Sequence, residues 1–444
     1  MSKNSPLFKL IGSLNKTEKG YFRRYAVTHS KSKQRKYLLL FDLIEKGATS
    51  DEDLRMQDAL GDKRQLPNLK QYLFNLILES LDIYYGYGDV ENMLKKQIRY
   101  SILLFNKAFY TEALNILGNT RKIALKYDRL LPSLEIISKE IRCLTFSSGE
   151  SIMTNKNGPM LLELQLELTE RYRKDCEILV LHQQVMFLQT KDPLGRIKNN
   201  TATDLLKSPL LNNQRIMPSF IGQSMQYEIM MLLYRKIRNE DKAHESEQLL
   251  IMLFENNPIQ IQERPFVFAG RLFNTGYRLA ERKKFREALE IVKKIRQVPS
   301  FLPGNKKHHY LLAGIFAYSS IIEAKACFWS GTLDKSQPLI CDIESGLKQY
   351  DTVINKNTKF DLHYCLFMLY FGTGNYSMAL LHLNKILNNP ELESYYQARI
   401  MMLIIQFEME KEGIIDHTVR SVYRFLLKRD RLYKFENSIL NFSR

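Results

Sequence analysis

The chain has 444 residues, of which 45% are hydrophobic and 25% are charged, a balance typical of globular proteins. This composition excludes a disordered or fibrous chain, and 20 glycines with 13 prolines are too few for a turn-rich β protein. The formal net charge is +17, which favours acidic partners such as nucleic acid, an anionic membrane surface or an acidic protein. The alternative is that the excess charge is spread over solvated helix surfaces.

Cysteine usage and hydropathy favour a cytoplasmic protein. Residues 1–20 lack the apolar segment of a signal peptide. The uncharged apolar run Tyr310–Ile322 is too short to cross a bilayer, so we expect a buried helix there and no membrane span. The number of cysteines is odd and no pair has CxxC spacing, which favours reduced thiols at Cys143, Cys176, Cys327, Cys341 and Cys365.

Residues 1–90 are predicted to form a basic N-terminal helical module. The strongly apolar run 37–44 ends before Gly47, and residues 50–53 have the hydroxyl and acidic side chains of a helix start. Pro67 then opens a helix whose apolar residues recur at i, i+3 and i+4. This order of helices is compatible with a helix-turn-helix and equally with any small helical bundle.

Basic and aromatic residues alternate over residues 16–36, which we call the N-terminal basic stretch. The first 40 residues contain ten lysines and arginines but a single acidic residue. Basic residues beside aromatic rings can bind phosphates and stack on bases. Alternatively, the rings face the core and the cations face solvent. The candidate nucleic-acid-binding residues are Arg23, Arg24, Lys31, Lys33, Arg35 and Lys36.

Helical periodicity continues through the rest of the chain, with one interruption. Over residues 91–190 we expect helical hairpins followed by a long helix from Leu161 to Leu188. Residues 191–220 are rich in proline and asparagine, which predicts an irregular linker or loop and a candidate domain boundary. Residues 221–444 are again helical.

One short word recurs three times, beginning at Tyr110, Phe285 and Tyr376. Each copy has an aromatic residue, two variable residues, an alanine and a leucine. At the start of a helix the ring can fill the gap between two antiparallel helices, and the alanine on the same face lets them approach closely. The word therefore predicts repeated helical hairpins.

These words make parts of the chain resemble the tetratricopeptide repeat (TPR) family. The segment Leu272–Pro299 is the best match, Tyr370–Pro390 fits the same template, and Glu228–Pro258 is a weaker copy. The resemblance covers residues 221–400 and, less well, 95–140. The spacing exceeds the family's period of about 34 residues, so the repeats are degenerate and irregular. The matching residues of the best copy are Gly276, Phe285, Ala288 and Pro299.

The resemblance implies an all-α protein, an α-solenoid of antiparallel helix hairpins with an N-terminal helical module. Residues 221–444 would form the TPR-like repeats and C-terminal capping helices. The first helix of each repeat would line an inner surface that binds a peptide or protein. On that template the partner-binding residues are Met231, Arg235, Phe273, Tyr277, Tyr364 and Met368. The alternative is that these six side chains pack in the core.

No residue pattern indicates catalysis. The sequence has no GxxxxGK[ST] loop, no GxSxG word, no HExxH word and no paired Cys/His spacing. We therefore expect no enzyme activity, no catalytic residue, no cofactor and no metal. The first hypothesis is a protein-interaction scaffold. The alternative is a nucleic-acid-binding regulator that uses the basic N-terminal module. The sequence leaves the oligomeric state open.

Overall fold

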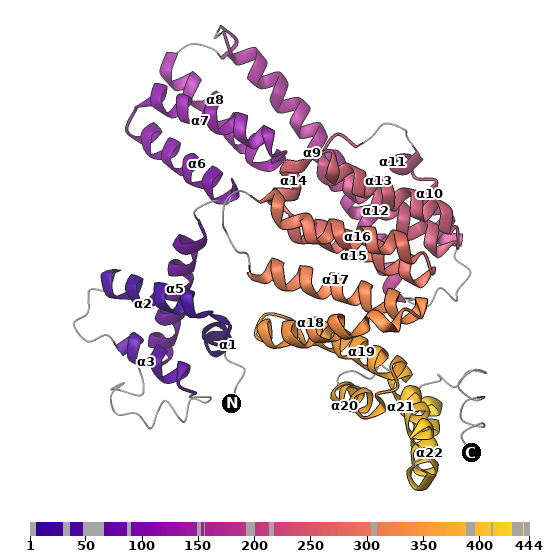
Figure 1. Ribbon diagram of the computed structural model, residues 1–444. Coiled ribbons are helices and arrows are strands. Elements are labelled where there is room, and N and C mark those ends of the chain that lie inside the picture. The colour runs from indigo at the N-terminus through magenta and orange to yellow at the C-terminus, as the bar shows by residue number, and fades with distance from the viewer. Residues whose placement is uncertain are drawn as a thin grey trace. The chain divides into compact units, whose positions relative to one another are not determined.

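The fold is all-helical, as predicted. In a computed structural model the described residues form helices and short connections, and none of them is in a strand (Figure 1). The chain divides into two compact units, Met1–Cys176 and Glu177–Arg444. The described residues are 6–29, 36–47, 66–86, 90–148, 152–154, 156–191, 200–212, 217–302, 309–387, 396–409, 412–428 and 438.

The described residues of the first 86 positions form four helices around a shared apolar core. Helices α1, α2 and α3 all contact α5. Phe22, Phe41, Leu73 and Ile77 are fully buried between them, which explains the apolar spacing seen in the sequence. The helix start predicted at residues 50–53 lies outside the described residues. The bounds are α1 (Pro6–Ser13), α2 (Lys16–His29), α3 (Lys36–Glu45) and α5 (Leu66–Gly86).

Three more helices follow, and each packs on the next. Helix α7 contacts both α6 and α8, and Ala113 of the first sequence word is fully buried among Ile98, Leu117 and Ile136. The long helix predicted from Leu161 is present as α9. The bounds are α6 (Val90–Asn106), α7 (Tyr110–Lys126), α8 (Leu130–Ser148), a short 3-10 turn η3 (Ile152–Thr154) and α9 (Gly158–Lys191), whose second half belongs to the second unit.

The second unit consists of helices that mostly pack against their sequence neighbours. Within residues 191–220, short helices α10 (Asn200–Leu206) and α11 (Pro209–Asn212) contact α12. The other bounds are α12 (Phe220–Lys236), α13 (Glu240–Glu255), α14 (Pro258–Glu263), α15 (Pro265–Glu281), α16 (Phe285–Gln297), η4 (Val298–Phe301), α17 (His309–Ser330), η5 (Leu333–Lys335), α18 (Ser336–Gln349), α19 (Lys356–Gly372), α20 (Tyr376–Leu387), α21 (Tyr396–Glu408) and α22 (Glu412–Lys428).

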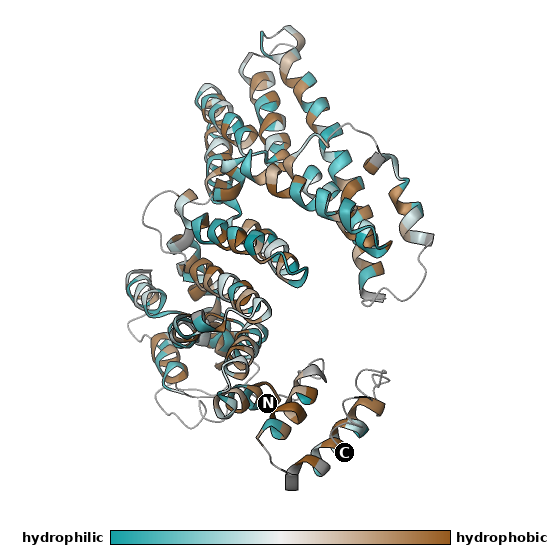
Figure 2. Ribbon diagram, turned by 45° about the vertical axis from the view of Figure 1, so that its right-hand side comes forward, coloured by the Kyte–Doolittle hydropathy of each residue, from teal (hydrophilic) through white to brown (hydrophobic). Residues whose placement is uncertain are grey.

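Two kinds of contact organise this unit. Paired helices pack closely, as in α12 with α13, α15 with α16, α19 with α20 and α21 with α22. In addition α15 contacts α17, and α17 contacts α19 (Figure 1). Gly276 permits one of these approaches, because a Cβ there would lie 2.7 Å from Ile322 of α17. Hydrophobic and hydrophilic segments alternate along most helices, as expected for amphipathic helices (Figure 2).

Among the described residues, Gly331 makes a related turn with a longer hydrogen bond between α17 and η5, and the same tighter turn closes five pairs of consecutive α-helices. In each of these five turns one residue is left-handed, with φ between 51° and 76°. The N–H of the next residue donates to the carbonyl five positions earlier, at 2.8 to 3.0 Å, which satisfies an orphan carbonyl of the helix end. The left-handed residues are Ala108, Asp128, Arg238, Lys283 and Gly374.

Helix α17 contains the apolar run Tyr310–Ile322 and is largely buried. It is the single helix in the described part of the chain that is long and apolar enough to cross a membrane by length and composition. However, 61% of its apolar window is buried by the rest of the protein. The run therefore serves as a core helix between α15, α16 and α19, as predicted.

Candidate functional site

The six residues predicted to line a partner surface have different environments. Met231 and Met368 are 5% and 4% exposed, so they are core side chains with almost no surface for a partner. Arg235 is mostly covered and its guanidinium lies 3.3 Å from the Glu247 carboxylate of α13. For these three residues the structure matches the alternative of packing in the core, because their side chains lie against neighbouring helices.

The other three predicted residues lie against one hydrophobic cluster. Phe273 and Tyr277 are on α15 and Tyr364 is on α19, and all three are partly buried against the core between α17 and α19. The Phe273 and Tyr277 rings have centroids 5.7 Å apart. These residues keep exposed ring surface while their remaining surface is packed.

A continuous line of rings extends from this pair over α17. Tyr318 of α17 stacks on Phe273 with centroids 4.5 Å apart. On its other side Tyr318 meets Phe266, at the start of α15, at 5.8 Å. Tyr277 contacts α17 farther along, where its ring lies under the Lys325 ammonium. The rings therefore connect the beginning of α15 with the end of α17.

Lys325 is a nearly buried cation held between two rings. Its Nζ lies 3.5 Å from the Tyr277 ring centroid and 4.9 Å from that of Trp329, with the residue only 8% exposed. The nearest carboxylate oxygen, Glu281 Oε1, is 3.6 Å away, too far for a hydrogen bond. Burial lowers the pKa of Lys325, and the charges of Glu281 and Asp361 offset part of that effect.

A pocket of about 270 Å³ lies at the other end of the line of rings. Its walls include Phe266, Tyr310 and Tyr318, and its polar groups come from Asn355 and Thr358 at the start of α19. Three small residues of α17 also line it. A Cβ at Gly314 would lie 2.5 Å from the Phe266 ring, so glycine is required for that ring to cover the helix. The small and remaining apolar lining residues are Ala313, Gly314, Ala317, Val353 and Ile354.

Helical spacing places the pocket and Lys325 along the same side of α17. Residues 310, 314, 318, 325 and 329 recur at intervals of four or seven, close to whole turns of an α-helix. On α15, residues 266, 273, 277 and 281 also recur at intervals of four or seven, so they lie along one side of that helix. We call this surface the aromatic strip, defined by Phe266, Phe273, Tyr277, Tyr310, Tyr318, Lys325 and Trp329.

Another face of α15 carries charged residues with a structural role. Arg271 makes two contacts of 2.5 and 2.6 Å with Glu228 of α12, and His182 of α9 lies 3.4 Å from the same carboxylate. Burial raises the pKa of Glu228, but the contacts with His182 and Arg271 outweigh it and lower the pKa to about 2. Farther along, Arg278 and Arg282 pair with carboxylates of α13. These ion pairs join α15 to the preceding helices.

The aromatic side chains of the N-terminal basic stretch are used mainly inside their module. Phe22 and Tyr37 are buried, and Tyr21 packs on Tyr84 with centroids 5.0 Å apart. Tyr25 packs against the same core. Stacking on bases would require free ring faces. This arrangement matches the alternative in which the rings face the core.

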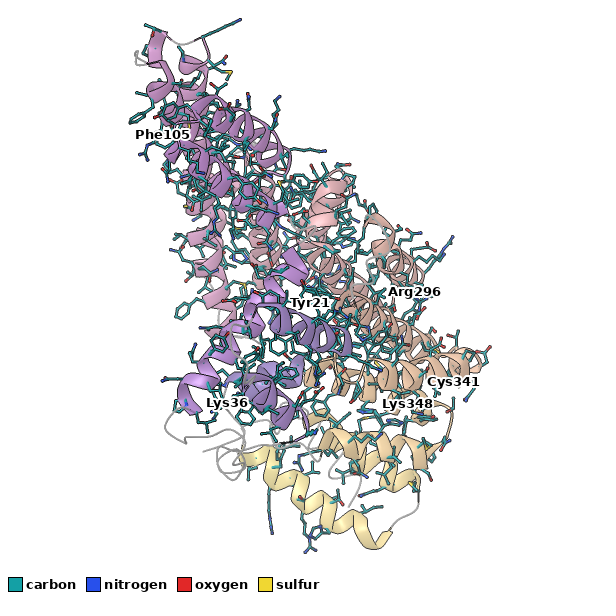
Figure 3. All side chains as sticks on the ribbon, turned by 90° about the vertical axis from the view of Figure 1, so that its left-hand side faces the viewer. Tyr21, Lys36, Phe105, Arg296, Cys341 and Lys348 are labelled. Carbon is teal, nitrogen blue, oxygen red and sulfur yellow. The ribbon has the colours of Figure 1, made fainter. Side chains whose placement is uncertain are left out.

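The basic residues of that stretch differ in how far they are neutralised. Arg23 lies 2.7 Å from Asp42 and also pairs with Glu45, and its guanidinium covers the Phe41 ring. Arg24 is exposed, and Lys36 is partly exposed at the first position of α3 (Figure 3). Lys31, Lys33 and Arg35 lie outside the described residues.

Two histidines that the sequence did not single out form a buried pair. His363 of α19 and His382 of α20 have Nδ1 atoms 3.1 Å apart, and the other ring nitrogen of His382 faces Glu344 at 3.7 Å. The carboxylate therefore lies on the wrong side to share a metal with both Nδ1 atoms. Among the described residues no group of three or more His, Cys, Asp or Glu side chains is placed to hold a metal ion.

Template reasoning missed Lys325, Trp329 and Tyr318 because α17 carries no copy of the sequence word. The spacing of Tyr310, Gly314 and Tyr318 on an apolar helix, followed by Lys325 and Trp329, is the signal that could have found them. Comparisons with protein-family models, with curated proteins and with solved structures gave no match for this chain.

Proposed function

We propose that this chain is a non-enzymatic, cytoplasmic protein-interaction scaffold that binds an extended peptide segment of a partner along the aromatic strip. Its helix pairs would form a TPR-like α-solenoid. The recurring left-handed turn supports this arrangement, since a repeated connection is what a series of equivalent hairpins requires. The contacts from α15 to α17 and from α17 to α19 supply neighbour-to-neighbour stacking.

The observation that carries the proposal is the pocket at one end of the aromatic strip. Phe266 and Tyr310 are 48% and 57% exposed, although each offers a large apolar ring. Exposed apolar surface beside a concave pocket marks binding sites more often than solvated surface does. Aromatic side chains also provide large contact area at low cost in conformational entropy. The pocket has the size of a single bulky side chain and its neighbours, as an anchor residue of a peptide requires.

The test uses a phage-displayed library of random 12-residue peptides, selected on the purified chain. Peptides that bind should lose about tenfold in affinity for Tyr310→Ala, since this side chain lines the pocket and is 57% exposed. The matched control is Leu381→Ala, which removes a 46% exposed apolar side chain from α20, outside the strip. Circular dichroism verifies that both variants are folded. The proposal fails if no peptide is selected, or if the selected peptides bind Tyr310→Ala as tightly as the parent protein.

A second candidate function is nucleic-acid binding by the N-terminal basic stretch. The concentration of ten basic residues in the first 40 favours it, and Arg24 is exposed to solvent. However, its rings are largely packed in the module and Arg23 is paired with acids, so fewer rings and cations are free to contact bases and phosphates. Nucleic-acid binding is therefore the weaker of the two candidate functions.

A further inference from the structure

Lys325 has more hydrogen-bonding capacity than its surroundings use. An ammonium group can donate three hydrogen bonds. Within the part of the chain that the structure describes, the Lys325 ammonium has a single carboxylate partner, Glu281 at 3.6 Å, and two ring contacts. The residue is 8% exposed, so most of its surface is withheld from water. A buried cation with unused donors is costly unless an acceptor arrives.

We infer that Lys325 binds an acidic side chain of the peptide that occupies the aromatic strip, in place of Glu281. This inference rests on the proposed peptide-binding function and specifies the chemistry of the partner. The carboxylate would accept hydrogen bonds from Nζ while the peptide covers the rings of Tyr277 and Trp329. The chain's net charge of +17 favours the approach of an acidic segment.

Glu281 can give way because it holds Lys325 only loosely. Its side chain is 46% exposed and its carboxylate lies beyond hydrogen-bond distance. Ion pairs with one exposed partner are weak, and the released carboxylate returns to water. Burial lowers the pKa of Lys325, and the charges of Glu281 and of Asp361 on α19 oppose that shift, as an incoming carboxylate at the same place would.

The distance along α17 sets the spacing in the peptide. The pocket is centred near Gly314 and the cation is Lys325, eleven residues later, which corresponds to about 16 Å at a rise of 1.5 Å per residue. An extended chain covers this distance in about five residues at 3.3 Å each. The partner segment should therefore carry a bulky apolar residue and, about five positions away, an aspartate or glutamate.

The first experiment compares selections from the same random 12-residue phage library on three proteins. On the parent chain, selected peptides should be enriched in an acidic residue four to six positions from an aromatic or branched apolar residue. On Lys325→Met the apolar residue should persist and the acidic preference should disappear. On Tyr310→Ala both preferences should weaken, because the anchor pocket is impaired.

The second experiment measures one selected peptide and its Glu→Gln (or Asp→Asn) counterpart by titration. Trp329 is the single tryptophan of the chain and lies beside Lys325, so its emission reports binding of tryptophan-free peptides. The amide peptide should bind the parent chain about tenfold more weakly, and the difference should vanish on Lys325→Met. Glu281→Gln should strengthen binding of the acidic peptide about threefold, because the competing carboxylate is gone.

The possible failures are distinguishable. If peptides require Tyr310 but bind equally as acid and amide, the Lys325 inference is overturned and the peptide-binding function stands. If Glu281→Gln weakens binding of the acidic peptide, Glu281 itself contacts the ligand, and the inference that the peptide replaces Glu281 is wrong. This outcome can be read even if Lys325→Met folds poorly. If no Tyr310-dependent peptide is found, the proposed function and this inference both fail.

Discussion

Lowering the pH from 7 to 4.5 should destabilise the second unit through the buried pair His363 and His382. Their Nδ1 atoms are 3.1 Å apart, so one ring must donate a hydrogen and the other must accept it. His382 is 3% exposed, and its ring stacks on Tyr370 with centroids 5.6 Å apart. If its Nδ1 accepts from His363, its second nitrogen carries the hydrogen that faces Glu344. A further proton would break the hydrogen bond between the two rings.

The size of the effect follows from the displaced pKa values. Burial lowers the pKa of both histidines from 6.5 to about 4, and the charge of Lys385 adds to it. Lys359 also lowers the pKa of His363. Because the unfolded chain binds these protons at higher pH, the stabilisation is complete above pH 6.5 and is lost as the pH falls toward 4. For His382 alone the loss by pH 4.5 is about 2 kcal/mol.

The assay is urea unfolding at pH 7 and at pH 4.5, followed by the emission of Trp329, which belongs to the same unit. His382→Phe keeps an aromatic ring beside Tyr370 and removes the titrating group. This variant should lose about 2 kcal/mol less than the parent between the two pH values. The matched control is His417→Phe on α22, an exposed histidine, which should leave the pH dependence unchanged. Equal losses for the parent and His382→Phe would refute the reasoning.

Three further predictions concern packing, ion pairs and nucleic acid. Gly346→Ala should lower the melting temperature and cost about 1–3 kcal/mol, because its Cβ would lie 2.1 Å from the Phe316 ring. Gly270→Ala, whose Cβ would have its nearest neighbour at 4.0 Å, should instead stabilise α15 by up to about 1 kcal/mol. Equal shifts in the melting temperatures of the two variants would contradict this contrast. Arg271→Met should cost about 1–3 kcal/mol in urea unfolding, because the partly buried Glu228 carboxylate then has only His182 beside it. An unchanged free energy of unfolding would show that the Arg271–Glu228 pair does not stabilise the unit. If the protein binds nucleic acid, fluorescence anisotropy should show binding of single-stranded DNA at about 50 mM salt and its loss at about 200 mM salt. Reversing the charges of the basic residues in the N-terminal basic stretch should also abolish the binding. Absence of binding at the lower salt concentration rejects this function.

The repeated aromatic-x-x-Ala-Leu word was sufficient to locate the starts of three helices. Tyr110, Phe285 and Tyr376, the first residues of the three sequence words, are the first residues of α7, α16 and α20. The alanines three positions later are fully buried in all three helices. These features depend on neighbours within one hairpin, whose separation along the chain is short enough for periodicity to reveal.

The candidate site was only partly predictable, since it depends on contacts between hairpins. Phe273 and Tyr277 were predicted and lie on the aromatic strip, but the same template placed Met231 and Met368 on a partner surface when they are core residues. Lys325 lies 48 positions after Tyr277 in the sequence, and nothing in either segment alone indicates that the ammonium rests on that ring.

The row of arginines on α15 has a consequence for how the second unit can be assembled. Arg271, Arg278 and Arg282 each pair with an acid supplied by the hairpin of α12 and α13, which comes before α15. If another hairpin of the chain took that place, at least two largely covered guanidinium groups would lose their counterions, which is destabilising. The order of the segments is thus enforced by charge as well as by shape. A hairpin grafted or deleted at this junction should leave a folded protein only if acidic partners for these arginines are kept.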